Sequence, residues 1–161
     1  MSTEAQVRTQ VVNLIKGIYS TLGFDEYPGN VKEYLLELEV PEQRGAYLSA
    51  TVESKKVVRA WAVQVVRLES NETEQATRSG EYEVTIVGYY DWTSGIANTM
   101  LDHASAIRGE IYKRVNTSLG GTVDYITDST AVSFEEVGSE IHDNLLAISF
   151  SFSAFVTRAS T

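Results

Sequence analysis

The chain is 161 residues long and contains no cysteine, two prolines and two histidines. Without cysteine it can have no disulfide, no thiol nucleophile and no thiolate metal site. With so little histidine, a zinc site of the usual kind would have to use carboxylate ligands. No apolar run approaches the roughly 18 residues that a membrane-spanning helix needs. The N-terminus also lacks the basic and apolar regions of a signal peptide, so we expect no membrane partner.

Basic residues are also scarce. Thirteen Lys and Arg stand against twenty-two Asp and Glu, which gives a formal net charge of -9. Tight binding to a phosphate backbone needs clustered Lys and Arg, so we expect no sequence-specific nucleic-acid binding. An acidic channel would instead repel DNA and let it pass without sticking. The plainer interpretation is that the excess of acid serves solubility.

What the chain does have is two long β patterns. Residues 57–69 are apolar on both faces in the middle, which predicts a strand covered on two sides. Residues 81–91 alternate, with Tyr82, Val84 and Ile86 on one face and charged or polar residues on the other. The link 70–80 is polar and predicts an exposed, flexible loop. We therefore expect a long antiparallel hairpin.

Two helices are predicted by apolar residues spaced three and four apart. The first spans 3–22. The second spans 95–119, with Thr93 or Ser94 as N-cap and Gly120-Gly121 ending it in the left-handed conformation. Further strands are expected over 31–40, 48–52, 122–126, 131–137 and 144–157, and the tail 158–161 is expected to fray. The order predicts one α+β domain over 1–161: an antiparallel or mixed sheet with a long hairpin, packed against one long central helix and an N-terminal helix.

No residue spacing indicates catalysis or a cofactor. Asp102-His103 and His142-Asp143 are acid–imidazole neighbours, but adjacent residues point to different sides of an element. His103 lies off the apolar stripe and is expected to face solvent. Catalytic, cofactor-binding and metal residues are therefore all predicted to be none. Four aromatic residues offer either a stacking platform or, more plainly, core filling: Trp61, Tyr89, Tyr90 and Trp92.

The order of elements and several local sequences resemble the tail terminator (tail completion) proteins of long-tailed bacteriophages and tail-like particles. The resemblance covers nearly the whole chain, although this family has no invariant catalytic motif. It rests first on the N-terminal helix 6–22 and on the hairpin strands 57–69 and 81–91, the second of which ends in the aromatic-acidic sequence Ile86-Val87-Gly88-Tyr89-Tyr90-Asp91. It rests also on the helix 102–111 and the strands 121–126 and 147–156.

The resemblance implies a structural virion protein that is not an enzyme and needs no cofactor. Such proteins form a hexameric ring on the head-proximal end of the tail tube, stop its polymerisation and join the tail to the neck. DNA passes through the lumen of the ring. The implied partners are further copies of the chain, the tail tube protein and a head–tail connector protein, in a virion assembled in the host cytoplasm. Exposed strand edges and the hairpin could extend a sheet between subunits. We place the subunit or tube contact at Glu69, Glu72, Glu74, Arg78, Tyr89 and Trp92.

Three other functions stay open. Another neck ring, such as a head–tail adaptor or stopper, belongs to the same class. A ligand-binding α+β module could use Trp61, Tyr82 and Tyr90 to line a pocket. An enzyme is disfavoured because no nucleophile–base or metal spacing is present.

Overall fold

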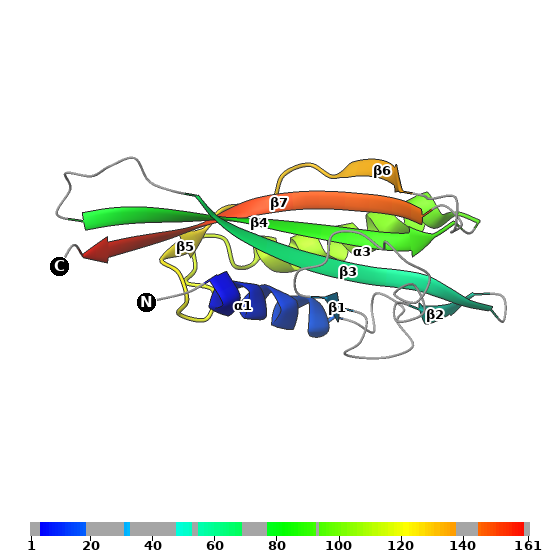
Figure 1. Ribbon diagram of the computed structural model, residues 1–161, viewed down its shortest axis with the longest axis horizontal. Coiled ribbons are helices and arrows are strands. Elements are labelled where there is room, and N and C mark those ends of the chain that lie inside the picture. The colour runs from blue at the N-terminus through cyan, green and yellow to red at the C-terminus, as the bar shows by residue number, and fades with distance from the viewer. Residues whose placement is uncertain are drawn as a thin grey trace.

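A computed structural model describes residues 4–18, 31–32, 48–52, 55–68, 77–92, 94–137 and 145–159. The molecule is elongated, with two long strands running most of its length (Figure 1). Its elements, in chain order, are α1 (Glu4–Lys16), β1 (Val31–Lys32), β2 (Leu48–Val52), β3 (Lys55–Leu68), β4 (Thr77–Asp91), α3 (Ile96–Tyr112), β5 (Tyr125–Ile126), β6 (Ser133–Val137) and β7 (Leu145–Ala159).

The described strands form one sheet in the order β1-β3-β4-β7-β5, with β2 also paired to β3 and β6 to β7. All of these pairs are antiparallel except β1 with β3, which is parallel. Strands and helices do not alternate as in a βαβ fold, so the α+β class predicted from the sequence is confirmed. Residues 69–76, which join β3 to β4, lie outside the described part, and the hairpin itself stays a prediction.

One face of the sheet, the core face, packs against both helices. The row Val63, Ile86 and Phe150 runs across β3, β4 and β7 in register, and all three residues are buried. They join buried apolar residues of both helices in a single cluster, including Val11 of α1 and Ile107 of α3. Figure 1 shows α1 and α3 running along the sheet rather than across its end. The apolar side predicted for β4 is confirmed, since Tyr82, Val84, Ile86 and Tyr90 are all buried in this cluster, although Asp91 on the other side is buried as well.

A large and a small residue meet at the centre of the core face. Trp61 on β3 is paired with Gly88 on β4 and is fully buried. A Cβ atom added at Gly88 would lie 2.8 Å from Cη2 of the indole. Gly88 therefore provides the space in which the Trp61 ring lies flat against the sheet.

The second helix is shorter than predicted. It ends at Tyr112 rather than 119, which gives a rod of about 26 Å instead of about 36 Å. Beyond Tyr112 the backbone tightens, because Arg114 N–H donates to the Ile111 carbonyl at 2.9 Å. Asn116 then adopts a left-handed φ of 63°, and its N–H donates to the Ile126 carbonyl of β5 at 3.1 Å. The neighbouring strand thus takes the bond that a continuing helix would have made.

Other element boundaries also differ from the prediction. The N-cap of α3 is Gly95, with a left-handed φ of 73°, and not Ser94; Thr93 lies outside the described residues. The helix α1 ends at Lys16, and Gly17 and Ile18 close it with a turn. β1 covers two of the residues predicted as a strand over 31–40, and 33–40 are not among those described.

The long strands reach further than the sequence indicates. β4 begins at Thr77 instead of 81, and β7 continues to Ala159 where a frayed tail is expected. The two extensions pair with each other, from Thr77 opposite Ala159 to Gly80 opposite Val156. They form a two-stranded projection, seen at the left of Figure 1. Backbone pairing holds this projection, and backbone pairing needs no apolar alternation in the sequence.

Candidate interaction surface

The face of the sheet opposite the helices, the outer face, is closed at one end and open at the other. At the closed end Ala60, Tyr89 and Ala147 form a row across β3, β4 and β7, and each is at most 5% exposed. Towards the other end, Val66 and Leu68 of β3 are 44% and 38% exposed. The outer face therefore offers accessible apolar side chains only along part of its length.

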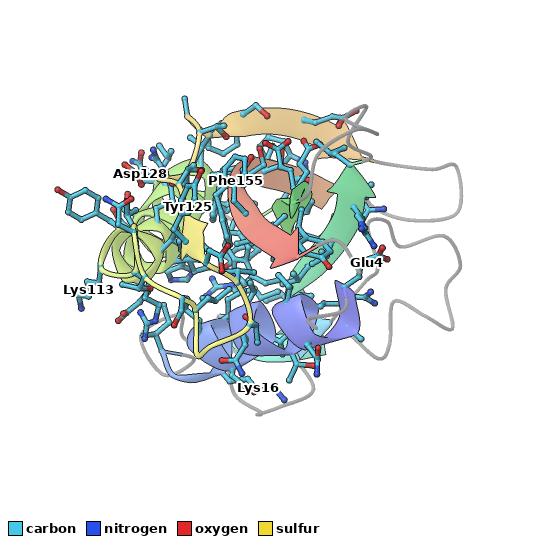
Figure 2. The ribbon with its side chains drawn as sticks, turned by 90° about the vertical axis from the view of Figure 1, so that its left-hand side faces the viewer. Glu4, Lys16, Lys113, Tyr125, Asp128 and Phe155 are labelled. Carbon is cyan, nitrogen blue, oxygen red and sulfur yellow. The ribbon has the colours of Figure 1, made fainter. Side chains whose placement is uncertain are left out.

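We define the open patch as Val66, Leu68, Glu81, Glu83 and Tyr125. Leu68 pairs with Glu81, Glu81 with Phe155, and Phe155 with Tyr125, so one row crosses four strands. The Tyr125 and Phe155 rings stack with centroids 4.9 Å apart, as seen near the top of Figure 2. Val66 and Glu83 form the next row, and Glu83 is exposed. Two carboxylates thus lie between apolar side chains on either side.

The edge of β7 that faces away from β4 is occupied by backbone and hydroxyl groups of the segment between β5 and β6. Thr127 and Thr130 donate backbone N–H bonds to the carbonyls of Ser153 and Ser151 at 2.9 and 2.7 Å. Their Oγ1 atoms accept the N–H bonds of the same two serines, each at 3.0 Å. With β5 and β6 paired on either side of this segment, the β7 edge from Leu145 to Phe155 has little room for a strand from another subunit. An extension of the sheet between subunits would therefore have to use another edge.

A chain of three buried or half-buried rings links β3, β4 and α3. The Trp61 Nε1–H donates to the Tyr90 hydroxyl oxygen at 2.9 Å, and that oxygen lies 2.5 Å from His103 Nδ1. Burial raises the pKa of the Tyr90 hydroxyl well above its usual range, so the hydroxyl stays protonated. It therefore donates to Nδ1, which leaves the imidazole proton on Nε2.

The environment of His103 keeps the imidazole neutral. Burial, with a smaller contribution from the Arg59 guanidinium, lowers the pKa of His103 to about 4, while Asp102 opposes the shift. Arg59 also lies over the Tyr90 ring, 5.5 Å from its centroid. The expectation that His103 faces solvent is wrong, because its ring packs on Tyr90 with centroids 5.6 Å apart. The helical spacing of apolar residues could not predict the contact between His103 and Tyr90, because a polar residue beside the apolar stripe gives no sign of a buried partner.

The aromatic platform is not formed. Trp61 and Tyr90 are fully buried and Tyr89 is 4% exposed, so core filling is the correct interpretation for these three. Tyr82 is also buried, at 1%, which leaves Trp61, Tyr82 and Tyr90 packed in the core rather than around a pocket. Trp92 is 49% exposed just after β4.

Whether the six predicted contact residues form one site stays a prediction. Glu69, Glu72 and Glu74 lie outside the described residues. Arg78 lies in β4, paired with Arg158. Tyr89 lies at the closed end of the outer face, and an interface role for Trp92 stays a prediction. Sequence reasoning missed Val66, Leu68 and Tyr125, because the even-numbered positions of β3 include both buried and exposed residues and give no sign of where the cover ends.

Within the described ranges, no three His, Asp or Glu side chains are grouped as metal ligands would be. None of the described helices is long and apolar enough to cross a membrane. Comparison with known proteins adds no relative: no protein-family model matches the chain, and no curated sequence is significantly similar to it.

Proposed function

We propose that this protein is a structural virion protein of the tail terminator kind. It would form a ring that caps the head-proximal end of a phage tail tube, stops tube polymerisation and joins the tail to the neck. The observation that supports this most is the division of the sheet. The hydroxyl of Tyr90 and the imidazole of His103 are hydrogen-bonded to each other between the core face and α3. The open patch on the other face offers apolar side chains around two carboxylates. Such a surface suits docking better than chemistry.

The proposal gives each part of the fold a mechanical role. The paired strands β3 and β4 and the link between them form an arm that contacts a neighbouring subunit or the tube. The helix α3, packed along the core face, stiffens the sheet from which that arm extends. A net charge of -9 would make the lumen of a ring repel DNA, so that the genome passes without sticking.

The partners follow from this role: other copies of the chain, a tail tube protein on one side and a neck protein on the other. A head–tail adaptor or stopper would use the same ring but bind only neck proteins. Binding to purified tail tubes therefore separates the two functions. A ligand-binding module is disfavoured, because the three aromatic residues expected to line its pocket are at most 1% exposed.

The test is capping of a polymerising tail tube, observed by negative-stain electron microscopy with native mass spectrometry of the free protein. Wild-type protein should shorten the tubes and decorate one end with a ring. Replacing residues 71–76 with two glycines should abolish capping and leave the circular dichroism spectrum unchanged, because β4 from Thr77 onward is kept. Tubes that grow to the same length with and without wild-type protein would overturn the proposal.

A further inference from the structure

The end of α3 carries a basic and aromatic projection, the knob, made of Tyr112, Lys113 and Arg114. Tyr112 is 68% exposed, more than any other large apolar side chain that the structure describes. The side chain of Lys113 is 71% exposed. Among the side chains described, Lys113 and Arg67 are the exposed cations. On a protein of net charge -9, an exposed cation beside an exposed aromatic ring is a distinctive surface.

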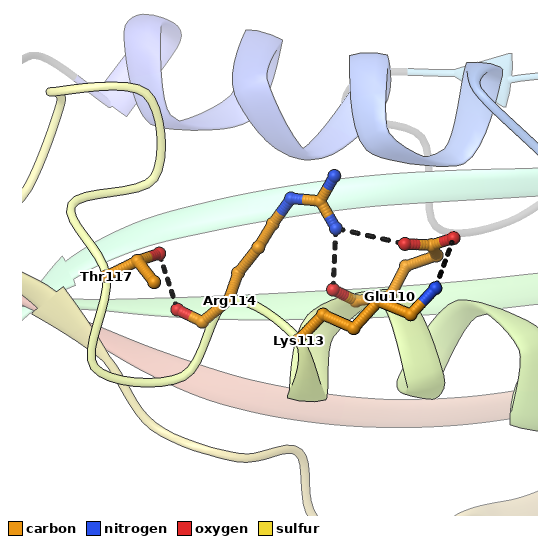
Figure 3. A network of polar contacts seen from close by, with 4 residues as sticks. All are labelled: Glu110, Lys113, Arg114 and Thr117. Atoms are coloured by element: carbon orange, nitrogen blue, oxygen red, sulfur yellow. Dashed lines mark hydrogen bonds and ion pairs between the residues drawn. The ribbon is translucent and has the colours of Figure 1, made fainter.

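Hydrogen bonds hold Arg114 and the backbone at the base of the knob, as Figure 3 shows. Arg114 Nη1 donates to the Glu110 carbonyl at 2.8 Å and to Glu110 Oε2 at 3.0 Å. Thr117 Oγ1 donates to the Arg114 carbonyl at 2.6 Å. Lys113 Nζ lies 3.5 Å from Glu110 Oε1, a loose contact that leaves its ammonium free to meet another carboxylate. The base of the knob is therefore ordered before docking, so little backbone freedom is lost there when a partner binds.

The knob and the open patch lie on opposite sides of the sheet. Helix α3 packs on the core face, whereas the open patch is on the outer face. They nevertheless lie at the same level along the strands. Just past the knob, Asn116 donates to the Ile126 carbonyl, and the neighbouring Tyr125 is paired with Phe155 in the row of the open patch. Figure 2, which looks along the strands, shows Lys113 at the left of the molecule and below Tyr125 and Phe155.

The two surfaces are complementary in chemistry. The open patch places Glu81 and Glu83 between Val66 and Leu68 on one side and Tyr125 on the other. The knob presents one exposed cation and one large aromatic ring, which match a carboxylate and its apolar border. Two copies of an acidic chain repel each other at long range, and a contact that places a cation against this acid offsets part of that repulsion.

We propose that the knob of one copy docks on the open patch of the next, with Lys113 opposite Glu83 and Tyr112 against Val66 and Leu68. Because the two surfaces differ, the contact is head-to-tail, and its repetition closes a ring when each copy is rotated about a common axis by an angle that divides the full turn. This inference rests on the proposed ring function and assigns the subunit contact to strands β3 and β4 of one copy and the end of α3 of the next.

The absence of cysteine makes the contact directly testable. Single variants Glu83→Cys and Lys113→Cys are mixed under mild oxidation, and disulfide-linked dimers are quantified by mass spectrometry. The mixed 83–113 dimer should form about tenfold faster than either homodimer, because docking raises the local concentration of the two thiols. The control pair is Glu83→Cys with Glu4→Cys, since Glu4 is an exposed acid on α1. An 83–113 rate equal to that of this control overturns the proposal.

Charge reversal gives a second measurement on the cysteine-free protein. Glu83→Lys and Lys113→Glu should each weaken self-association by about threefold in sedimentation velocity, and the double variant should regain the wild-type value. Both positions are exposed, so unchanged thermal unfolding serves as the folding control. Additive losses in the double variant would show that the two residues do not meet.

The two proposals fail in different ways. If wild-type protein caps tail tubes but the 83–113 disulfide does not form, the ring exists and the contact assigned here is wrong. If the disulfide forms but tubes are not capped, the self-contact holds and the terminator function fails. If Lys113→Cys links only to the tube protein, the knob is a tube contact and this inference is overturned.

Discussion

The two faces of the sheet use the same three strands for different purposes. On the core face, β3, β4 and β7 contribute a continuous set of large apolar side chains that the helices cover. On the outer face, burial stops part of the way along, and exposed apolar side chains then alternate with carboxylates and hydroxyls. One face therefore sets the stability of the fold, and the open part of the other is free to change without unfolding it.

Substitutions on a single strand test this difference most strongly. Trp61→Ala on the core face should lower the free energy of unfolding by about 3–5 kcal/mol, because it removes a fully buried indole and leaves a cavity. Val66→Ala, on the same strand but 44% exposed, should change it by less than about 0.5 kcal/mol. Urea denaturation followed by far-ultraviolet circular dichroism measures both. Similar losses for the two variants would show that the faces are not energetically distinct.

The contrast between the faces explains how far the sequence alone could go. Alternation in 81–91 placed Tyr82, Val84 and Ile86 correctly, because a period of two directly reports which side is buried. The ends of α3 and β4 were misplaced, because pairing with a distant strand decides them. Asn116 turns out of the helix towards Ile126, and Thr77–Gly80 become a strand through pairing with β7. Neither partner can be identified from local sequence.

The candidate surface was harder to predict than the fold for a related reason. A surface is made of residues brought together by register, and Leu68, Glu81 and Tyr125 come from three separate segments. Tyr89 shows the same limit in reverse, since it was assigned to a contact surface but is 4% exposed at the closed end of the outer face. Periodicity gives the side of a strand and says nothing about what covers that side.

A pair of glycine substitutions tests how tightly the core face is packed. Gly88→Ala should cost about 1–3 kcal/mol, since its Cβ would lie 2.8–2.9 Å from the fully buried Trp61 ring, which has no space to move into. Gly109→Ala in α3 should instead stabilise the protein by about 0.5–1 kcal/mol, because a Cβ there meets nothing within 4 Å and alanine favours helix. Thermal unfolding of the two variants should give shifts of opposite sign. A neutral Gly88→Ala would contradict the close contact with Trp61.

The hydrogen bonds that link Trp61, Tyr90 and His103 all depend on one atom, the Tyr90 hydroxyl oxygen. Tyr90→Phe removes the hydroxyl that accepts from Trp61 and donates to His103, so a buried indole N–H is left without its acceptor. The expected loss is about 1–2 kcal/mol in chemical denaturation. Tyr125→Phe is the matched control, because Tyr125 is 42% exposed and water replaces its hydrogen bonds. An equal effect of the two substitutions would mean that the buried hydroxyl contributes nothing beyond an exposed one.

The smallest expected effect is a dependence on pH that belongs to the core face alone. The pKa of His103 is about 4 in the folded protein and 6.5 when unperturbed, so between these values the unfolded chain binds more protons. The stability contributed by neutral His103 is therefore fully present above pH 6.5 and is lost as the pH falls towards 4. Because the ring is only partly buried, we expect a change on the order of 1 kcal/mol, well below the full linkage value.

Carboxylates titrate in the same range, so the informative quantity is the difference in unfolding free energy between wild type and His103→Gln, measured from about pH 7.5 to about pH 4.5. That difference should shrink or reverse as the pH falls, since only the wild type must protonate an imidazole held between Tyr90 and Arg59. A difference that stays constant over the whole range would show that the His103 ring is exposed to water and does not pack on Tyr90.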